Sequence, residues 1–195
     1  GWLGFASKAK VDSSLNTIGV TYYHQNFPLI GQLNHSSTYR LSDSTMLNRV
    51  RQSYRIDRPI PADTRIAQPL QVRTAKDLYT YGRWDFTLLI EVEYDSFANP
   101  ILVANLGDSL APNPVYIATT YDNDVANWQL GYLHTTTQSS DAAGKDLISL
   151  ERLTYNSMRD VVRQQSYNSQ LDAFVSSQFI YDAFGNQTSI VSAAG

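Results

Sequence analysis

The chain has 195 residues, of which 43% are hydrophobic and 17% are charged, and it carries a formal net charge of −3 with no cysteine. This composition is typical of a globular protein and excludes an intrinsically disordered one. The absence of cysteine excludes disulfides and thiolate metal sites. The acidic balance argues against a nucleic-acid partner, because phosphate binding needs a basic surface.

No targeting or membrane-spanning segment is evident. Residues 1–10, GWLGFASKAK, lack the basic region and long apolar run of a signal peptide. The longest apolar run, Leu88–Ile90, is far too short to cross a bilayer. The chain ends in VSAAG shortly after a repeated phrase, and we therefore expect it to be a piece of a longer protein.

Strand patterns dominate the chain. Thr, Val, Ile and Tyr are abundant, and in Trp84–Asp95 the side chains of Phe86, Leu88, Ile90 and Val92 alternate with mostly polar ones. We predict strands or hairpins in Asn16–Gln25, Leu47–Ile56, Trp84–Asp95, Val115–Asp122, Leu147–Asn156 and Ser176–Val191. The fold class expected from this pattern is all-β.

The segments between these strands have other patterns. Asp122–Leu133 could hold one helical turn, capped by its first residues and stopped by Gly131. Ile56–Leu70 contains several prolines and is expected to be an irregular or extended connection. His134–Asp146 is expected to be a polar loop, and residues 34–82 as a whole are expected to be the irregular or less typical part of a single domain, 1–195.

A phrase of six residues occurs twice, as YDSFAN in Tyr94–Asn99 and as YDAFGN in Tyr181–Asn186. Tyr followed by Asp or Asn recurs at Tyr94, Tyr121, Tyr155 and Tyr181, with separations of 27, 34 and 26 residues, and once more at Tyr167, 12 residues after Tyr155. A period of a few tens of residues is typical of stacked repeats. We therefore predict antiparallel β-hairpin repeats that form a curved sheet.

The phrase suits a hairpin corner. Tyr would end one strand and keep its hydroxyl for a partner, while Asp would accept hydrogen bonds from turn amides two residues on. Gly185 and Asn186 tolerate positive φ, whereas Ala98 replaces the glycine in the first copy, so that corner should be strained or differently shaped. The predicted repeat residues are Tyr94, Asp95, Asn99, Tyr121, Asp122, Tyr155, Tyr181, Asp182, Gly185 and Asn186.

Three ordered segments resemble the YD-repeat (RHS) family, and most closely the B component of insecticidal toxin complexes and its virulence-plasmid relatives. YDAFGNQTSI resembles the repeat phrase itself. The other two segments resemble stretches of the B component and are carried by Gly1, Trp2, Gly4, Phe5, Tyr23, Gln25, Phe27, Pro28 and Gly31, and by Tyr121, Asn123, Asp124, Trp128, Gly131 and Leu133.

The resemblance implies a function. Proteins of this family form a large hollow β-shell that encloses and protects a cytotoxic C-terminal polypeptide, and a propeller of the B component docks on a translocation-pore subunit. The family's self-cleaving aspartyl protease signature, of the Asp-Pro-x-Gly-Leu type, is absent here. We therefore expect a non-catalytic shell segment of an exported bacterial toxin, whose partners are the parent shell protein and its cargo. Trp2, Phe5, Phe27 and Trp128 would pack between repeat units.

Several alternatives involve chemistry. The histidines His24, His35 and His134 have no metal-ligand spacing, and we expect no metal and no cofactor. Glu91, Glu93 and Asp95 could serve a hydrolase or bind calcium, although a solvated strand face explains them more simply. Asp122–Asn127 resembles half of an EF-hand loop without its glycine and distal glutamate.

A basic cluster and the aromatic residues leave a binding role open. Arg49, Arg51 and Arg55 share one strand face and could contact an anionic surface, although a charged sheet edge that blocks aggregation is the simpler interpretation. Exposed Tyr and Trp side chains would suit a carbohydrate- or cell-surface-binding β-module, which is the alternative to a shell segment.

Overall fold

The structure is a computed structural model that describes residues 4–58 and 65–192. Within these ranges every regular element is a strand, which confirms the all-β prediction, and no helix there is long and apolar enough to cross a membrane. The strands are β1 (Ser7–Asp12), β2 (Thr17–Tyr23), β3 (Leu33–Arg40), β4 (Met46–Asp57), β5 (Gln68–Thr80), β6 (Arg83–Tyr94), β7 (Pro100–Asp108), β8 (Val115–Asp124), β9 (Gln129–Ser139), β10 (Leu147–Tyr155), β11 (Val161–Asn168), β12 (Ala173–Tyr181) and β13 (Gln187–Ser192).

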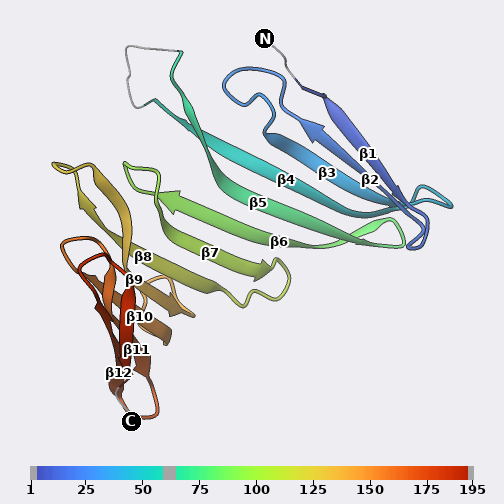
Figure 1. Ribbon diagram of the computed structural model, residues 1–195. Helices are drawn as coiled ribbons and strands as arrows, with labels where there is room; N and C mark the ends of the chain where they lie inside the picture. The colour runs from blue at the N-terminus through green and yellow to red at the C-terminus, as the bar shows by residue number, and fades with distance from the viewer. Residues whose placement is uncertain (1–3, 59–64, 193–195) are drawn as a thin grey trace. The chain divides into compact units, whose positions relative to one another are not determined.

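The strands form one sheet in sequence order, from β1 to β13 (Figure 1). Successive strands pair antiparallel, so each joins its neighbour through a hairpin. The sheet is not closed, and β1 and β13 are its edge strands among the described residues. The predicted antiparallel hairpin sheet is therefore confirmed.

The chain divides into two compact units. Unit 1 consists of residues 1–93 and 105–114, and unit 2 consists of residues 94–104 and 115–195. Unit 1 contains β1 to β5 and most of β6, while unit 2 contains β8 to β13. Each unit is described by itself below.

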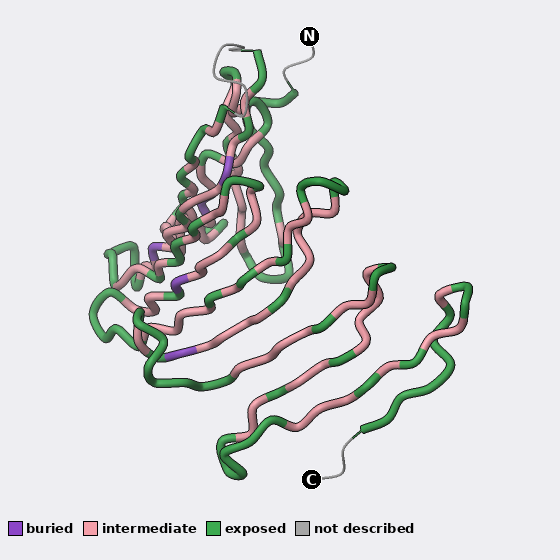
Figure 2. The backbone as a smooth tube through the Cα atoms, turned by 90° about the vertical axis from the view of Figure 1, so that its left-hand side faces the viewer, coloured by how far each residue is buried: buried purple, intermediate pink, exposed green. Residues whose placement is uncertain are grey.

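Few residues of the described chain are buried. The buried hydrophobic residues are Leu70 and Ala104, and the buried polar ones are Ser37, Asp77 and Ser139 (Figure 2, purple). A strand in such a sheet is covered by its two ladder neighbours and not by a second layer. Cross-strand side-chain pairs and backbone hydrogen bonds are therefore the main stabilising contacts.

One local prediction is wrong, and another holds only for residues 140–146 of its range. Asp122–Leu133 holds no helical turn, because β8 continues to Asp124 and β9 starts at Gln129 after a short turn. The predicted loop His134–Asp146 belongs to β9 as far as Ser139. Thr136 of this stretch pairs with Thr119 on one side and Glu151 on the other, so ladder hydrogen bonds from both neighbours hold the polar threonines in a strand.

The segment 34–82 consists largely of regular strands where it is described, namely β3, β4 and β5. Within Ile56–Leu70, Ile56 and Asp57 end β4, Gln68–Leu70 begins β5, and residues 59–64 lie outside the described ranges. β4 pairs with both β3 and β5, so the expectation that its arginines mark a sheet edge is wrong.

Candidate functional site

The two copies of the repeated phrase have the same hydrogen bonds. Asp95 Oδ1 accepts from the backbone N–H groups of Phe97 and Asn99, both at 2.8 Å, and Asp95 Oδ2 accepts from Asn99 Nδ2 at 3.0 Å. Asp182 repeats this with Phe184 N (2.8 Å), Asn186 N (2.9 Å) and Asn186 Nδ2 (3.0 Å). One acid therefore satisfies two turn amides and one side-chain amide.

A third corner has the acid and the amide exchanged. Asn156 Oδ1 accepts from Met158 N and Asp160 N, both at 2.9 Å, and Asn156 Nδ2 donates to Asp160 Oδ2 at 3.0 Å. We name Asp95–Asn99, Asn156–Asp160 and Asp182–Asn186 the acid–amide corners. Their shared signal is Tyr, then Asp or Asn, then the complementary residue four positions later.

The backbone of the three acid–amide corners is also alike. Their fourth residues, Ala98, Arg159 and Gly185, have positive φ values of 66°, 69° and 83°. In each corner the fourth residue's N–H donates to the first residue's carbonyl, at 3.1–3.2 Å, and the first residue's N–H donates to the fifth residue's carbonyl, at 2.9–3.0 Å. The corner at Ala98 therefore has the same shape as that at Gly185. Of the two predicted alternatives, a different shape is wrong, and the positive φ of Ala98 agrees with a strained corner.

The hydroxyls of the repeat tyrosines donate hydrogen bonds to backbone carbonyls of the preceding strand. Tyr155 donates to the carbonyl of Leu133 at 2.7 Å, and Tyr181 donates to that of Val161 at 2.8 Å. Tyr121 makes the same kind of bond to Pro100 at 3.2 Å. Burial raises the pKa of Tyr155, so its hydroxyl stays a proton donor.

Tyr54 in unit 1 makes the same contact, which the sequence did not predict. Its hydroxyl lies 3.0 Å from the carbonyl oxygen of Leu33 and 2.7 Å from Gln52 Oε1, two acceptors that share its single proton. Arg55 follows it where the other repeat tyrosines have Asp or Asn. No signal in the sequence marks this tyrosine, because its place is set by the bulge between Ser53 and Tyr54.

Most register shifts of the described ladders coincide with a tyrosine. They fall directly before Tyr23, Tyr39, Tyr54, Tyr79, Tyr121, Tyr155 and Tyr181, while two others lie at Leu147/Ser149 and Asp122/Asp124. At each tyrosine the next strand has one extra residue, which is a β-bulge. A bulge bends that strand and increases its twist.

The tyrosine hydroxyls link successive hairpins at the bulges, and we name this series of hydrogen bonds the tyrosine relay. Leu133 pairs with Tyr121 and accepts from Tyr155, and Val161 pairs with Tyr155 and accepts from Tyr181. In unit 1, Leu33 likewise pairs with Tyr23 and accepts the hydroxyl of Tyr54. Each hydroxyl thus binds the residue that faces the previous repeat tyrosine, which links hairpin to hairpin.

Asp122 does not form a corner of the predicted kind. The turn after β8 is organised by Asp124, whose Oδ1 accepts from Asn127 N at 3.1 Å and whose Oδ2 accepts from Asn127 Nδ2 at 2.7 Å. Asp122 instead pairs with Arg159 of the next corner. The reason is that β8 extends two residues beyond Asp122.

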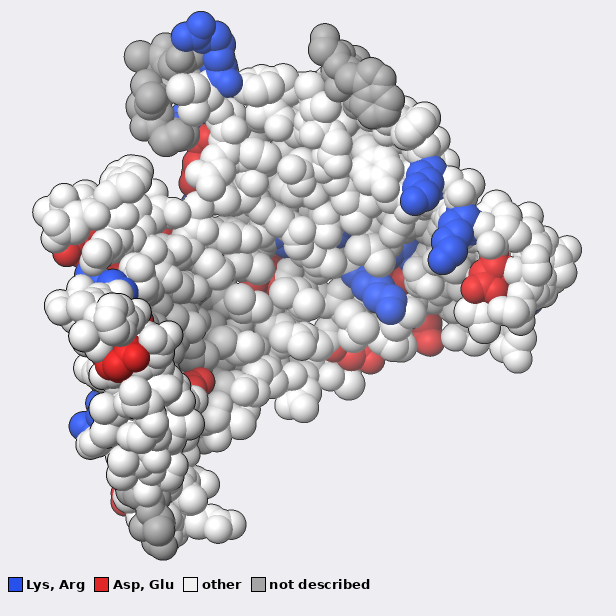
Figure 3. All heavy atoms as spheres, in the orientation of Figure 1, with Lys and Arg blue, Asp and Glu red and all other residues white. Residues whose placement is uncertain are grey.

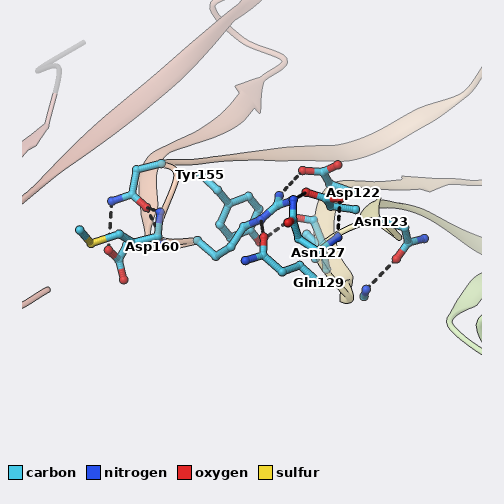
Figure 4. A network of polar contacts seen from close by, with 12 residues as sticks. Asp122, Asn123, Asn127, Gln129, Tyr155 and Asp160 are labelled. Atoms are coloured by element: carbon cyan, nitrogen blue, oxygen red, sulfur yellow. Dashed lines mark hydrogen bonds and ion pairs between the residues drawn. The ribbon is translucent and has the colours of Figure 1, made fainter.

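Arg159 connects this turn with the corner after β10. It binds Asp122 and donates to Gln129 Oε1 at 2.6 Å, and its guanidinium lies 5.0 Å from the ring centroid of Tyr132. Figure 4 shows Asp122, Gln129 and Tyr155 grouped at this place. Only 14% of the Arg159 side chain is exposed. A recess of about 340 Å³ beside it is lined by Tyr121, Asp122, His134, Leu153, Thr154, Tyr155 and Arg159.

The corner carboxylates are acidic. Burial raises the pKa of Asp95, but the hydrogen bonds from Asn99 and Phe97 together outweigh it and hold that pKa below its usual range. The side-chain amide of Asn186, together with the backbone N–H groups of the corner, lowers the pKa of Asp182. A general acid needs a raised pKa, so neither carboxylate suits that role.

The predicted acidic triad does not form a cluster. Asp95 is the acceptor of its own corner, and Glu91 lies 3.5 Å from Arg73 Nε. No group of three His, Asp or Glu side chains that could hold a metal occurs among the described residues. His35 stacks on Tyr22 with ring centroids 4.5 Å apart, and burial together with Arg49 lowers its pKa.

The basic cluster of β4 is engaged within unit 1. Arg51 makes two hydrogen bonds to the buried Asp77, at 2.9 and 3.1 Å, and Thr87 Oγ1 donates to Asp77 Oδ1 at 2.8 Å. Arg55 pairs with Asp57 at 2.8 Å, and Arg49 lies directly opposite Asp77. On the face drawn in Figure 3, basic and acidic side chains are interspersed.

The aromatic residues expected to pack between repeats are exposed. Phe5, Phe27 and Trp128 have exposed fractions of 74%, 56% and 79%, and Trp2 lies outside the described residues. They stand before β1 or in turns, where no ladder neighbour covers them. The structure therefore does not place Phe5, Phe27 or Trp128 in packing contacts between repeats.

No model of a known protein family matches the chain, and no curated protein sequence matches it significantly.

Proposed function

We propose that this chain is a non-catalytic wall segment of a YD-repeat (RHS) toxin shell, which encloses and protects a cytotoxic C-terminal polypeptide for delivery. The observation that carries the proposal is the equivalent hydrogen bonding of the three acid–amide corners in an open antiparallel sheet. A wall built of hairpins needs a corner that recurs and a link from each hairpin to the next. The acid–amide corners and the tyrosine relay supply these two parts.

The exposed surface also supports a wall. Among the described residues only Leu70, Ala104, Ser37, Asp77 and Ser139 are buried. A single-layer sheet leaves both faces accessible, one for the cargo and one for the outside. The corner carboxylates of Asp95 and Asp182 and the β4 residue Arg51 are held by neighbouring groups, which favours a structural role for them.

Protease protection tests this proposal. The complete polypeptide that contains this segment is treated with a non-specific protease, and its C-terminal region is followed by mass spectrometry. We expect that region to survive in the intact protein and to be digested when it is expressed alone. Equal digestion in both forms, or a parent protein without further Tyr-Asp repeats, would refute the shell function.

Carbohydrate binding is the second candidate, and the exposed tryptophans favour it. Trp128 and Trp84 have exposed fractions of 79% and 52%, and exposed indole rings suit stacking against sugars. Screening the chain on a glycan array tests this candidate, with Trp128→Ala and Trp84→Ala as variants. Reproducible binding that either substitution abolishes would support it, and no binding would exclude it.

A further inference from the structure

The two edge strands differ in how they are protected against pairing. β1, Ser7–Asp12, carries Lys8, Lys10 and Asp12 along its six residues. β13, Gln187–Ser192, has no charged residue and no proline, and all six of its residues are exposed. Natural sheets block exposed edges with lysine, proline or a cover. β13 has neither lysine nor proline, so it is suited to accept a further strand.

The backbone direction of β13 can be deduced from one contact. Thr188 Oγ1 donates to the carbonyl of Ile180 at 3.1 Å, so that carbonyl faces β13. Ile180 pairs with Ser189, and hydrogen-bonded and non-hydrogen-bonded pairs alternate along an antiparallel ladder. The next pair, Phe179 with Ile190, is therefore non-hydrogen-bonded. The N–H and C=O of Ile190 point to the open edge.

The corners also define where a tyrosine hydroxyl binds. The residue directly after the first corner, Pro100, accepts from Tyr121, and the residue after the second, Val161, accepts from Tyr181. Gln187 follows the third corner and pairs with Tyr181, just as Val161 pairs with Tyr155. Its carbonyl is therefore the next acceptor in the series.

We propose that the β13 edge binds an extended antiparallel strand that ends in tyrosine, whose hydroxyl donates to the carbonyl of Gln187. The ladder would provide the affinity, and the hydroxyl would fix the register, since a shift by one residue moves every side chain to the other face. This surface follows from the corners and the edge alone, and it does not depend on the toxin-shell function.

A peptide from the chain itself is the probe. A labelled peptide with the sequence of Leu147–Asp160 contains a strand and a corner that already make this contact. Its binding to the full chain is measured by fluorescence anisotropy, next to the same peptide with Tyr155→Phe. We expect the tyrosine peptide to bind about fivefold more tightly, which corresponds to one net hydrogen bond. Equal affinities, or no binding by either peptide, would overturn the proposal.

The protein side provides two further measurements. Ile190→Pro removes an N–H that points to the open edge, a position where proline is tolerated, and it should abolish peptide binding without lowering the melting temperature. In the unaltered chain, the peptide should slow hydrogen exchange at Ile190. Peptide binding that survives Ile190→Pro, or dimerisation through β13 that excludes the tyrosine peptide, would overturn the proposal in favour of another site or of self-pairing.

Discussion

The two units stabilise the same kind of sheet by different means. Unit 2 repeats a local device, the acid–amide corner, whose hydrogen bonds span at most four residues. Unit 1 instead has a polar cluster within the sheet, where Arg51 and Thr87 meet the buried Asp77 from strands on either side. In unit 1, Asp12 accepts from the N–H groups of Ser14 and Leu15, and Asp43 accepts from that of Thr45, so these described turns share the first corner bond but not the bond to the residue four positions on.

This difference distinguishes a turn that can be repeated along the chain from a cluster that depends on one particular set of strands. A corner that is complete within five residues can be copied along a chain, because it does not depend on the neighbouring hairpin. The Asp77 cluster needs three strands in one register, and its residues are 26 and 10 positions apart. Unit 1 should therefore lose stability as a whole when the cluster is broken, whereas a broken corner in unit 2 should have local consequences.

The largest expected effect comes from the cluster of unit 1. Asp77→Ala removes the acceptor for Arg51 and Thr87 and should lower the free energy of unfolding by about 2–3 kcal/mol, less than for a fully buried pair because Arg51 is half-exposed. Urea denaturation measures this loss. Asp57→Ala, which breaks the exposed pair with Arg55, is the control and should cost at most about 0.5 kcal/mol. Equal losses would contradict the proposed role of the cluster.

The acid–amide corner should give the next largest effect. Asn156→Ala leaves the N–H groups of Met158 and Asp160 without their acceptor and should cost about 1–2 kcal/mol. The double substitution Asn156→Asp with Asp160→Asn recreates the arrangement of Asp95 and Asn99, and it should retain stability within about 0.5 kcal/mol. A double variant as unstable as Asn156→Ala would show that the corners are not interchangeable.

The sequence predicted the fold class and the hairpin corners because both depend on local pattern. Alternation along Trp84–Asp95 predicts a strand, and Tyr-Asp with a small residue and Asn predicts a turn. The errors lie where neighbouring strands decide the outcome. The threonines after His134 are polar enough for a loop, yet pairing on both sides makes them a strand.

The tyrosine relay could not be predicted from the sequence, because neighbouring strands determine these contacts as well. The hydroxyl of Tyr155 binds the carbonyl of Leu133, 22 residues earlier in the sequence, and this separation depends on the length of the intervening loop. The acceptor is a backbone carbonyl, which leaves no signal in the choice of residue. Tyr54 was missed because its role is fixed by the bulge between Ser53 and Tyr54 and not by the residue that follows.

The relay itself should contribute less than a corner. Tyr155→Phe removes one hydroxyl bond to Leu133 while keeping the ring, and it should lower the free energy of unfolding by about 1 kcal/mol. Tyr167→Phe is the matched control, because its hydroxyl binds the exposed side chain of Asp172 on a neighbouring turn. It should leave stability unchanged in urea denaturation. Similar losses in both variants would remove the special role of the repeat tyrosines.

Backbone strain distinguishes the two copies of the repeated phrase. Ala98 and Gly185 occupy the same left-handed position, so Ala98→Gly should stabilise its corner by about 0.5–1 kcal/mol, and Gly185→Ala should destabilise its corner by a similar amount. No atom lies within 4 Å of a methyl group added at Gly185, so that effect measures φ alone. Melting temperatures that move in the same direction would contradict the equivalence of the corners.

The smallest expected effect is the loss of stability at acidic pH. The pKa values of Asp95 and Asp182 are lowered in the folded chain, so their ionised forms stabilise the corners above the unfolded value of about 3.9. This contribution should be lost as the pH falls from about 4 through the lowered values.

Replacing Asn156 with Asp in the double variant places a third carboxylate in the same set of N–H donors, because the geometry of that corner already matches the other two. Carboxyl resonances followed by NMR between pH 2 and 6 should therefore include one new group with a lowered pKa. An ordinary pKa for the new carboxylate would mean that the N–H groups of this corner do not hydrogen-bond it as those of the other two corners bond Asp95 and Asp182.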